Sequence, residues 1–66
     1  MSKLYSSAQI VKVLRKKGFV LISQRGSHAK FRKASKTVIV PMAKKEIPMG
    51  TFHSIVRQSG LKKNDF

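Results

Sequence analysis

The stretch Arg25-Gly26-Ser27-His28-Ala29-Lys30-Phe31-Arg32 decides how this chain folds. From residue 27 to residue 33 small or apolar residues alternate with polar ones, and this period of two predicts a β-strand. Ala29 and Phe31 then face one side of the strand, toward a core, because successive side chains of a strand point to opposite faces. The polar members face the other side: His28, Lys30 and Arg32.

Two further strands are predicted around this one. Arg25-Gly26 predicts a tight hairpin turn, because glycine readily takes the positive φ that such turns need. Residues 19–23 are β-branched, aromatic or apolar up to a final serine, and they predict the strand that enters the turn. Residues 37–40, which Pro41 closes, predict the strand that follows. The three strands are expected to form an antiparallel meander.

Helical patterns lie on both sides of the strands. Ser6 and Gln9 have the spacing of a capping box, and an apolar stripe runs from there to Gly18, which predicts a helix over residues 7–17. A second apolar stripe predicts a helix from about Met49 to a stop at Gly60. The chain is therefore expected to be one α+β domain, residues 1–66, of order α-β-β-β-α, with both helices on one face of the sheet.

The apolar faces of these elements predict one core. Residues 19–23 are apolar on both sides, so the pattern leaves open whether Leu21 or Ile22 points inward. Tyr5 is expected to pack on the first helix, and residues 62–66 are expected to form a frayed tail. The predicted core consists of Ile10, Val13, Leu14, Phe19, Leu21, Phe31, Val38, Val40, Phe52, Ile55, Val56 and Leu61.

The charge of the chain indicates its class of partner. Fifteen Lys and Arg residues against two Asp and Glu give a formal net charge of +13 and a pI near 11.3. A small domain this basic is expected to bind nucleic acid or a strongly acidic protein. The absence of cysteine excludes a disulfide scaffold and a thiolate zinc site. Two acidic side chains are too few for the carboxylate cluster of a Mg²⁺ nuclease, so no metal and no cofactor are expected.

Nothing in the sequence points to a membrane. No apolar run approaches the roughly 18 residues that a membrane span requires. The first five residues, Met1-Ser2-Lys3-Leu4-Tyr5, contain no secretory hydrophobic region. A cytoplasmic protein without a membrane partner is therefore expected.

His28 is the residue expected to carry any chemistry. The pKa of a free imidazole, about 6.5, lies near neutral pH and suits general acid–base catalysis. A plain surface histidine in a hairpin would show the same local pattern. His53, with Arg57 on an exposed helix face, is the rival, but a solvated or phosphate-contacting role is commoner there.

The neighbours of His28 are candidates for phosphate contacts. Arg25, Lys30 and Arg32 carry the charge that such contacts use. Gly26 is either a turn glycine or a point of close approach to a phosphate. Ser27 either donates to a phosphate or caps the turn.

The chain resembles a known family at several points. Gly26-Ser27-His28, followed by Phe31, resembles a motif of the HicA toxins, which are small bacterial mRNA interferases. Val38-Ile39-Val40-Pro41 and Lys45-Glu46-Ile47 extend the resemblance, and so does the segment from Gly50-Thr51-Phe52 to Leu61. Together these motifs cover the chain from Ser6 to Leu61.

The resemblance implies a fold, an activity and a partner. The fold would be like that of a double-stranded-RNA-binding domain. The activity would be metal-independent cleavage of mRNA, with His28 as the catalytic residue. The residues themselves, rather than the resemblance, make Arg25, Gly26, Ser27, Lys30 and Arg32 the expected RNA-binding residues. The protein would be the toxin of a type II toxin–antitoxin system that a HicB-type antitoxin neutralises. DNA would be reached only indirectly, through that antitoxin.

The resemblance departs from the family pattern after Pro41. Many relatives carry a second histidine there, where this chain has Met42-Ala43-Lys44. Any contribution of that imidazole is expected to be absent or supplied differently. The alternative function is a non-catalytic module that binds double-stranded RNA by its shape. A membrane-active amphipathic peptide is disfavoured, because the helix caps and strands specify a globular core.

Overall fold

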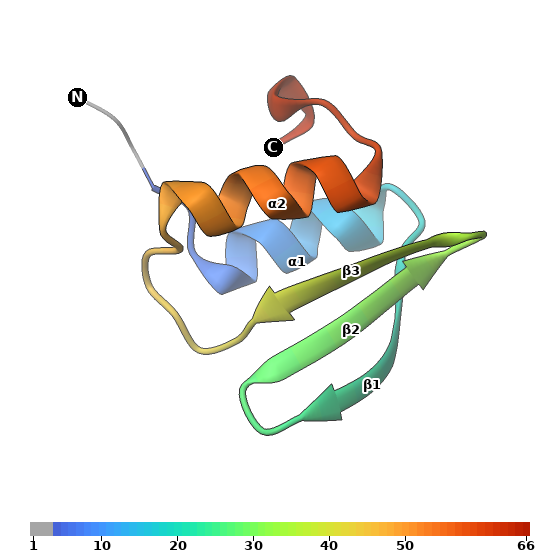
Figure 1. Cartoon of the computed structure of the whole chain (residues 1–66), viewed down its shortest axis with the longest axis horizontal. Helices are drawn as coiled ribbons and strands as arrows, with labels where there is room; N and C mark the ends of the chain where they lie inside the picture. The colour runs from blue at the N-terminus through green and yellow to red at the C-terminus, as the bar shows by residue number, and fades with distance from the viewer. Residues whose placement is uncertain (1–3) are drawn as a thin grey trace.

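The computed structural model describes residues 4–66. Met1, Ser2 and Lys3 lie outside the described residues, and the prediction that the first five residues hold no secretory hydrophobic region falls partly on them. Within them no helix is long and apolar enough to cross a membrane. The elements follow the predicted order (Figure 1): α1 (Ser7–Lys16), β1 (Val20–Arg25), β2 (His28–Lys33), β3 (Lys36–Pro41), α2 (Met49–Ser59) and a short 3-10 helix, η1 (Lys63–Asp65).

The three strands form one antiparallel sheet in the order β1-β2-β3, and both helices lie side by side on one face of it (Figure 1). In β2, Ala29 and Phe31 are each 1% exposed on the helix side. His28, Lys30 and Arg32 are exposed on the opposite side. The alternation predicted for β2 is therefore confirmed, and so is the α+β fold class.

The predicted helix ends are confirmed. The Ser6 hydroxyl accepts a hydrogen bond from the Gln9 backbone N–H at 3.1 Å, and the Gln9 side chain accepts from the Ser6 N–H at 2.8 Å. These two bonds satisfy donors that an uncapped helix would leave free. Gly60 ends α2 with φ +71°, a conformation that side chains with a Cβ rarely adopt.

The core differs from the prediction at six residues: Ala29 and Ile47 are buried although the predicted core did not include them, and Val13, Leu21, Val56 and Leu61 are not fully buried. Ile47 of the loop before α2 is fully buried, although a loop residue carries no periodic signal. Leu21 pairs with Phe31 across the strands and faces the same, helix-covered side of the sheet, but it is 42% exposed. The reason is that α1 and α2 pack over β3 and leave β1 at the far edge of the sheet. Val13 is only half-buried. The fully buried apolar residues are Ile10, Leu14, Phe19, Ala29, Phe31, Val38, Val40, Ile47, Phe52 and Ile55.

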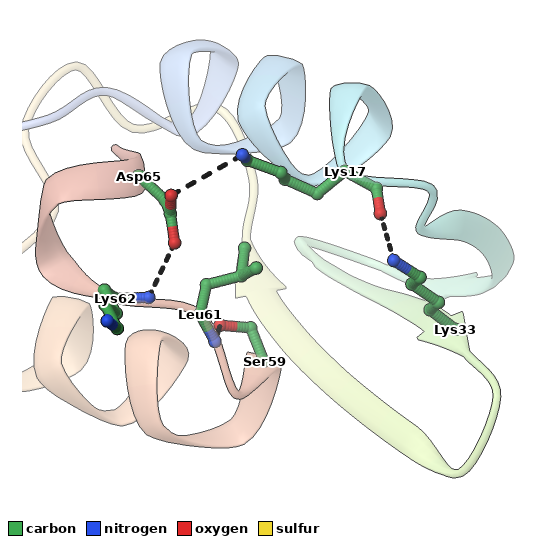
Figure 2. Close-up of polar contacts among 6 residues, drawn as sticks. All are labelled: Lys17, Lys33, Ser59, Leu61, Lys62 and Asp65. Carbon is green, nitrogen blue, oxygen red and sulfur yellow. Dashed lines mark hydrogen bonds and ion pairs between the residues drawn. The ribbon is translucent and has the colours of Figure 1, made fainter.

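The prediction of a frayed C-terminal tail is wrong. The Phe66 ring packs edge-on against Phe52, with ring centroids 5.4 Å apart. The Asp65 carboxylate accepts the Lys62 N–H at 2.8 Å and lies 3.5 Å from the Lys17 ammonium (Figure 2). The tail is therefore docked on the helices by one ring contact and one ion pair.

Two further side chains, those of Tyr5 and Lys33, make contacts that the sequence did not predict. Tyr5 packs against the core and stacks on Phe52 of α2, with ring centroids 4.9 Å apart, a contact that the sequence did not predict. The Lys33 ammonium donates to the Lys17 carbonyl at 2.7 Å (Figure 2). Because Lys33 ends β2 and Lys17 caps α1, this bond joins the helix to the sheet.

Ser7 fixes the loop that follows β3. Its side chain is almost fully buried, and its hydroxyl donates to the Pro41 carbonyl at 2.6 Å and accepts the Lys44 N–H at 3.0 Å. Its own N–H donates to the Lys44 carbonyl at 2.9 Å. Between these anchors Ala43 has φ +61°, a left-handed conformation that costs a residue with a Cβ about 1–2 kcal/mol. The start of α1 therefore holds this loop in place.

We expect Ser7→Ala to lower the free energy of unfolding by about 1–3 kcal/mol, because a buried carbonyl and a backbone N–H lose their shared partner. Urea titration of the purified variant measures this loss. Ser35→Ala, the same change in the exposed turn between β2 and β3, is the matched control and should stay within about 0.5 kcal/mol of wild type. Equal stability of the two variants would contradict the role given to Ser7.

Asp65 should make the stability depend on pH. The Lys62 N–H lowers the pKa of Asp65 most, partial burial opposes it, and Lys17 lowers it further. A carboxyl whose pKa is lower in the folded state stabilises the fold above its unfolded pKa, and this is lost as the pH falls through the folded pKa. We therefore expect Asp65→Asn to reduce the urea midpoint slightly at neutral pH and to match wild type in acid. A difference that persists in acid would show that the effect is not electrostatic.

Candidate functional site

His28 lies at one end of the face of the sheet that the helices leave uncovered. It is the first residue of β2, and its neighbours across the strands are Arg25 of β1 and Pro41 of β3. The adjacent Ala29 is buried under the helices, so His28 must point the other way. The hairpin turn beside it is tied to the loop after β3, because the Ser27 carbonyl accepts the Met42 N–H at 2.6 Å. The imidazole is exposed where the turn and the loop meet.

A basic hollow of about 530 Å³ lies on this face and is called here the sheet-side hollow. Strand register explains its lining, since Ser23, Lys30 and Ile39 form one cross-strand row. Its residues are Ser23, Arg25, His28, Lys30 and Ile39. Neither of the two acidic side chains lines it, so two cations flank the imidazole without a competing carboxylate.

A second hollow, of about 400 Å³, lies between β3 and α2 and is called here the helix-side hollow. Its apolar walls are Ile39, Pro41, Pro48 and Ile55. Its polar groups come from the loop, the sheet and one face of α2: His28, Lys44, Thr51, Ser54 and Gln58. Gln58 is anchored to the sheet, because its Oε1 accepts the Ile39 N–H at 3.2 Å. His28 and Ile39 line both hollows, so the imidazole stands on the ridge between them.

The predicted site residues do not all come together. Arg25 and Lys30 share the sheet-side hollow with His28. Gly26 has φ +54° with open space around it, which the hairpin turn explains. Ser27 lies in the same turn. Arg32 lies farther along β2, lines neither hollow, and donates from Nε to the Ala34 carbonyl at 3.1 Å.

The structure separates His53, the predicted rival of His28, from the segment after Pro41. His53 is exposed on α2 beside the Phe52 ring, and it lines neither hollow. The segment Met42-Ala43-Lys44, where many relatives have a second histidine, follows Pro41 directly and so lies next to His28. From this segment Lys44 lines the helix-side hollow, and its ammonium therefore lies on the same hollow as His28.

Three residues of the helix-side hollow escaped the sequence prediction. Thr51, Ser54 and Gln58 recur at spacings of three and four, which places them on one face of α2. The apolar stripe of the same helix was the stronger signal in the sequence, so the polar face formed by these three residues was not recognised as a candidate site. Among residues 4–66 no group of three or more His, Cys, Asp or Glu side chains could hold a metal ion.

Comparison with known proteins assigns the family. The model of a family described as "HicA toxin of bacterial toxin-antitoxin" matches residues 7–61. A search of curated proteins found no match. The matched range begins with the first residue of α1 and ends just beyond α2, so it contains all three strands and every residue that lines the two hollows. The chain therefore belongs to the HicA toxin family and is the toxin of a toxin–antitoxin system.

Proposed function

We propose that this toxin is an endoribonuclease that cleaves mRNA without a metal ion, and that His28 is its catalytic residue. The observation that supports the proposal best is the position of His28: an exposed imidazole on a ridge between two hollows, with Arg25 and Lys30 beside it. An RNA strand that crosses the ridge would bring a phosphodiester to the His28 imidazole, where the cations bind the negative charge of the phosphate.

The reaction uses the nucleophile that RNA carries. The ribose 2′-oxygen attacks the adjacent phosphorus, the bond from phosphorus to the 5′-oxygen breaks, and the products end in a 2′,3′-cyclic phosphate and a 5′-hydroxyl. One proton leaves the 2′-hydroxyl and one reaches the departing 5′-oxygen. Imidazole suits either transfer, and a single ring performs one of them. Water reaches this exposed site and completes the other.

The cations around His28 stabilise the charge that grows on the phosphorane. Arg25 and Lys30 act from the sheet-side hollow, and Lys44 acts from the loop on the other side of the ridge. Arg32 extends the contact along the backbone, since its single bond to Ala34 leaves most of its five donors for a phosphate. Gly26 and Ser27 contribute from the turn, through close approach and a hydroxyl donor.

The antitoxin partner is proposed to be of the HicB type, with an acidic surface that covers His28. A net charge of +13 would speed the association by electrostatic steering. The two outer strands also expose apolar side chains, with Val20 58%, Ile22 48% and Ile39 37% exposed, and Ile39 lines both hollows beside His28. Clustered exposed apolar groups are typical of interaction surfaces. Contact with operator DNA would then come only through the antitoxin.

His28→Ala should lower the rate of RNA cleavage at least about 100-fold, because general acid–base catalysis contributes about 10²–10⁴-fold. The measurement is cleavage of an mRNA by purified protein in excess chelator, together with RNA binding by the same variants. His53→Ala removes the other imidazole, which lines neither hollow, and is the matched control that should cleave like wild type.

Two outcomes would reject the proposal. If His28→Ala cuts RNA at the wild-type rate, His28 is not the catalytic residue. If wild-type protein binds RNA tightly but does not cut it, with or without Mg²⁺, the chain is a non-catalytic RNA-binding module.

A further inference from the structure

We propose that the helix-side hollow receives the base of a nucleotide next to the scissile phosphate, and that Thr51, Ser54 and Gln58 select that base. The inference builds on the proposed ribonuclease activity and adds a site for substrate selection. Family membership alone assigns no role to these three residues.

The two hollows differ in chemistry. Guanidinium and ammonium groups of Arg25 and Lys30 line the sheet-side hollow. The helix-side hollow has one ammonium, that of Lys44, and its other polar side chains besides His28 are hydroxyls and an amide. Arg and Lys supply many of the contacts to phosphates, and hydroxyl and amide side chains beside apolar surfaces can hydrogen-bond the edge of an unstacked base. The first hollow therefore suits the RNA backbone, and the second suits a base.

The shape of the helix-side hollow fits an unstacked base. Its volume, about 400 Å³, lies within the range of small-molecule sites, about 300–1,000 Å³. Ile39, Pro41 and Ile55 supply apolar walls against which the faces of a base can pack. The hydroxyls of Thr51 and Ser54 lie one turn apart on α2 and can donate to or accept from a base edge.

Gln58 is the residue best placed to discriminate between bases. The Ile39 N–H binds its Oε1 and so fixes the orientation of the side-chain amide. The two N–H groups on Nε2 take no part in that bond and present donors in a defined direction. A fixed donor favours bases that offer an acceptor there and penalises bases that offer a second donor.

The ridge position of His28 connects base selection to cleavage. Because His28 and Ile39 line both hollows, a nucleotide can rest its phosphate near Arg25 and Lys30 while the adjacent base enters the helix-side hollow. Binding of the base then holds the RNA strand against the imidazole of His28. Positioning of this kind favours cleavage next to the preferred base.

The test compares the bases found beside the cleaved bonds when each variant digests a pool of RNAs with random sequence. Ser54→Ala and Thr51→Val should weaken the preference at one position adjacent to the cut by about three- to ten-fold, the range expected for one lost hydrogen bond. Ser23→Ala makes the same change in the sheet-side hollow and is the matched control, which should keep the wild-type preference. Thermal unfolding of each variant confirms that it is folded.

Gln58→Glu tests the direction of discrimination. The carboxylate retains an oxygen for the Ile39 N–H and replaces the Nε2 donors with an acceptor. All RNAs should bind more weakly because of the added negative charge, so only the ranking of the bases counts. We expect the preferred base itself to change.

A binding arm separates this inference from the proposed activity. The affinities of His28→Ala for short RNAs that differ at one base are measured by fluorescence anisotropy, alone and combined with Ser54→Ala. A base preference that Ser54→Ala removes supports the inference even if His28 proves not to be catalytic. Unchanged preferences in all hollow variants would overturn it. If the hollow variants lose antitoxin binding but keep the base preference, the inference is also overturned, because the hollow would then be a binding site for the antitoxin.

Discussion

The burial of Phe31 between the sheet and the two helices is the constraint on which the site depends. Phe31 and Ala29 are each 1% exposed, and burial of a phenylalanine contributes about 1.5–3 kcal/mol. A shift of one residue in the strand would expose Phe31 and turn His28 into the core. Because side chains alternate along β2, burial of Ala29 and Phe31 on one face places His28 and Lys30 on the solvent-exposed face.

The second constraint acts at the edge strand β3 and the loop that follows it. Ser7 holds the loop after β3 through Pro41 and Lys44, and Gln58 joins α2 to the edge of β3. These bonds bring α2 and the loop to the ridge that carries His28. The two acidic residues take no part, since Asp65 anchors the C-terminus and Glu46 is exposed in the loop. The result is a cationic surface, which we propose binds an RNA strand or the antitoxin.

Local signals predicted most of the fold, and long-range contacts account for the rest. The capping box at Ser6, the stop at Gly60 and the alternation in β2 act within a few residues, so the sequence reveals them. Leu21 was misplaced in the core because which edge strand the helices cover is a tertiary property. The tail was expected to fray because the contact that holds it, Phe66 on Phe52 of α2, is long-range and leaves no local pattern. His28 and Lys30 were found from the alternation of residues along one strand, and Arg25 from the turn before it. Gln58 meets His28 only through the packing of α2 on β3.

The central claim is that His28 catalyses the attack of the ribose 2′-hydroxyl on the adjacent phosphorus. It is tested most directly with an RNA that carries a single 2′-deoxyribonucleotide at a mapped cleavage position, digested by wild-type protein in chelator. The account predicts that cleavage stops at that position alone, that other positions are still cut, and that their products end in 2′,3′-cyclic phosphate. Continued cleavage after the deoxynucleotide would contradict it, because the nucleophile would then not be the 2′-hydroxyl.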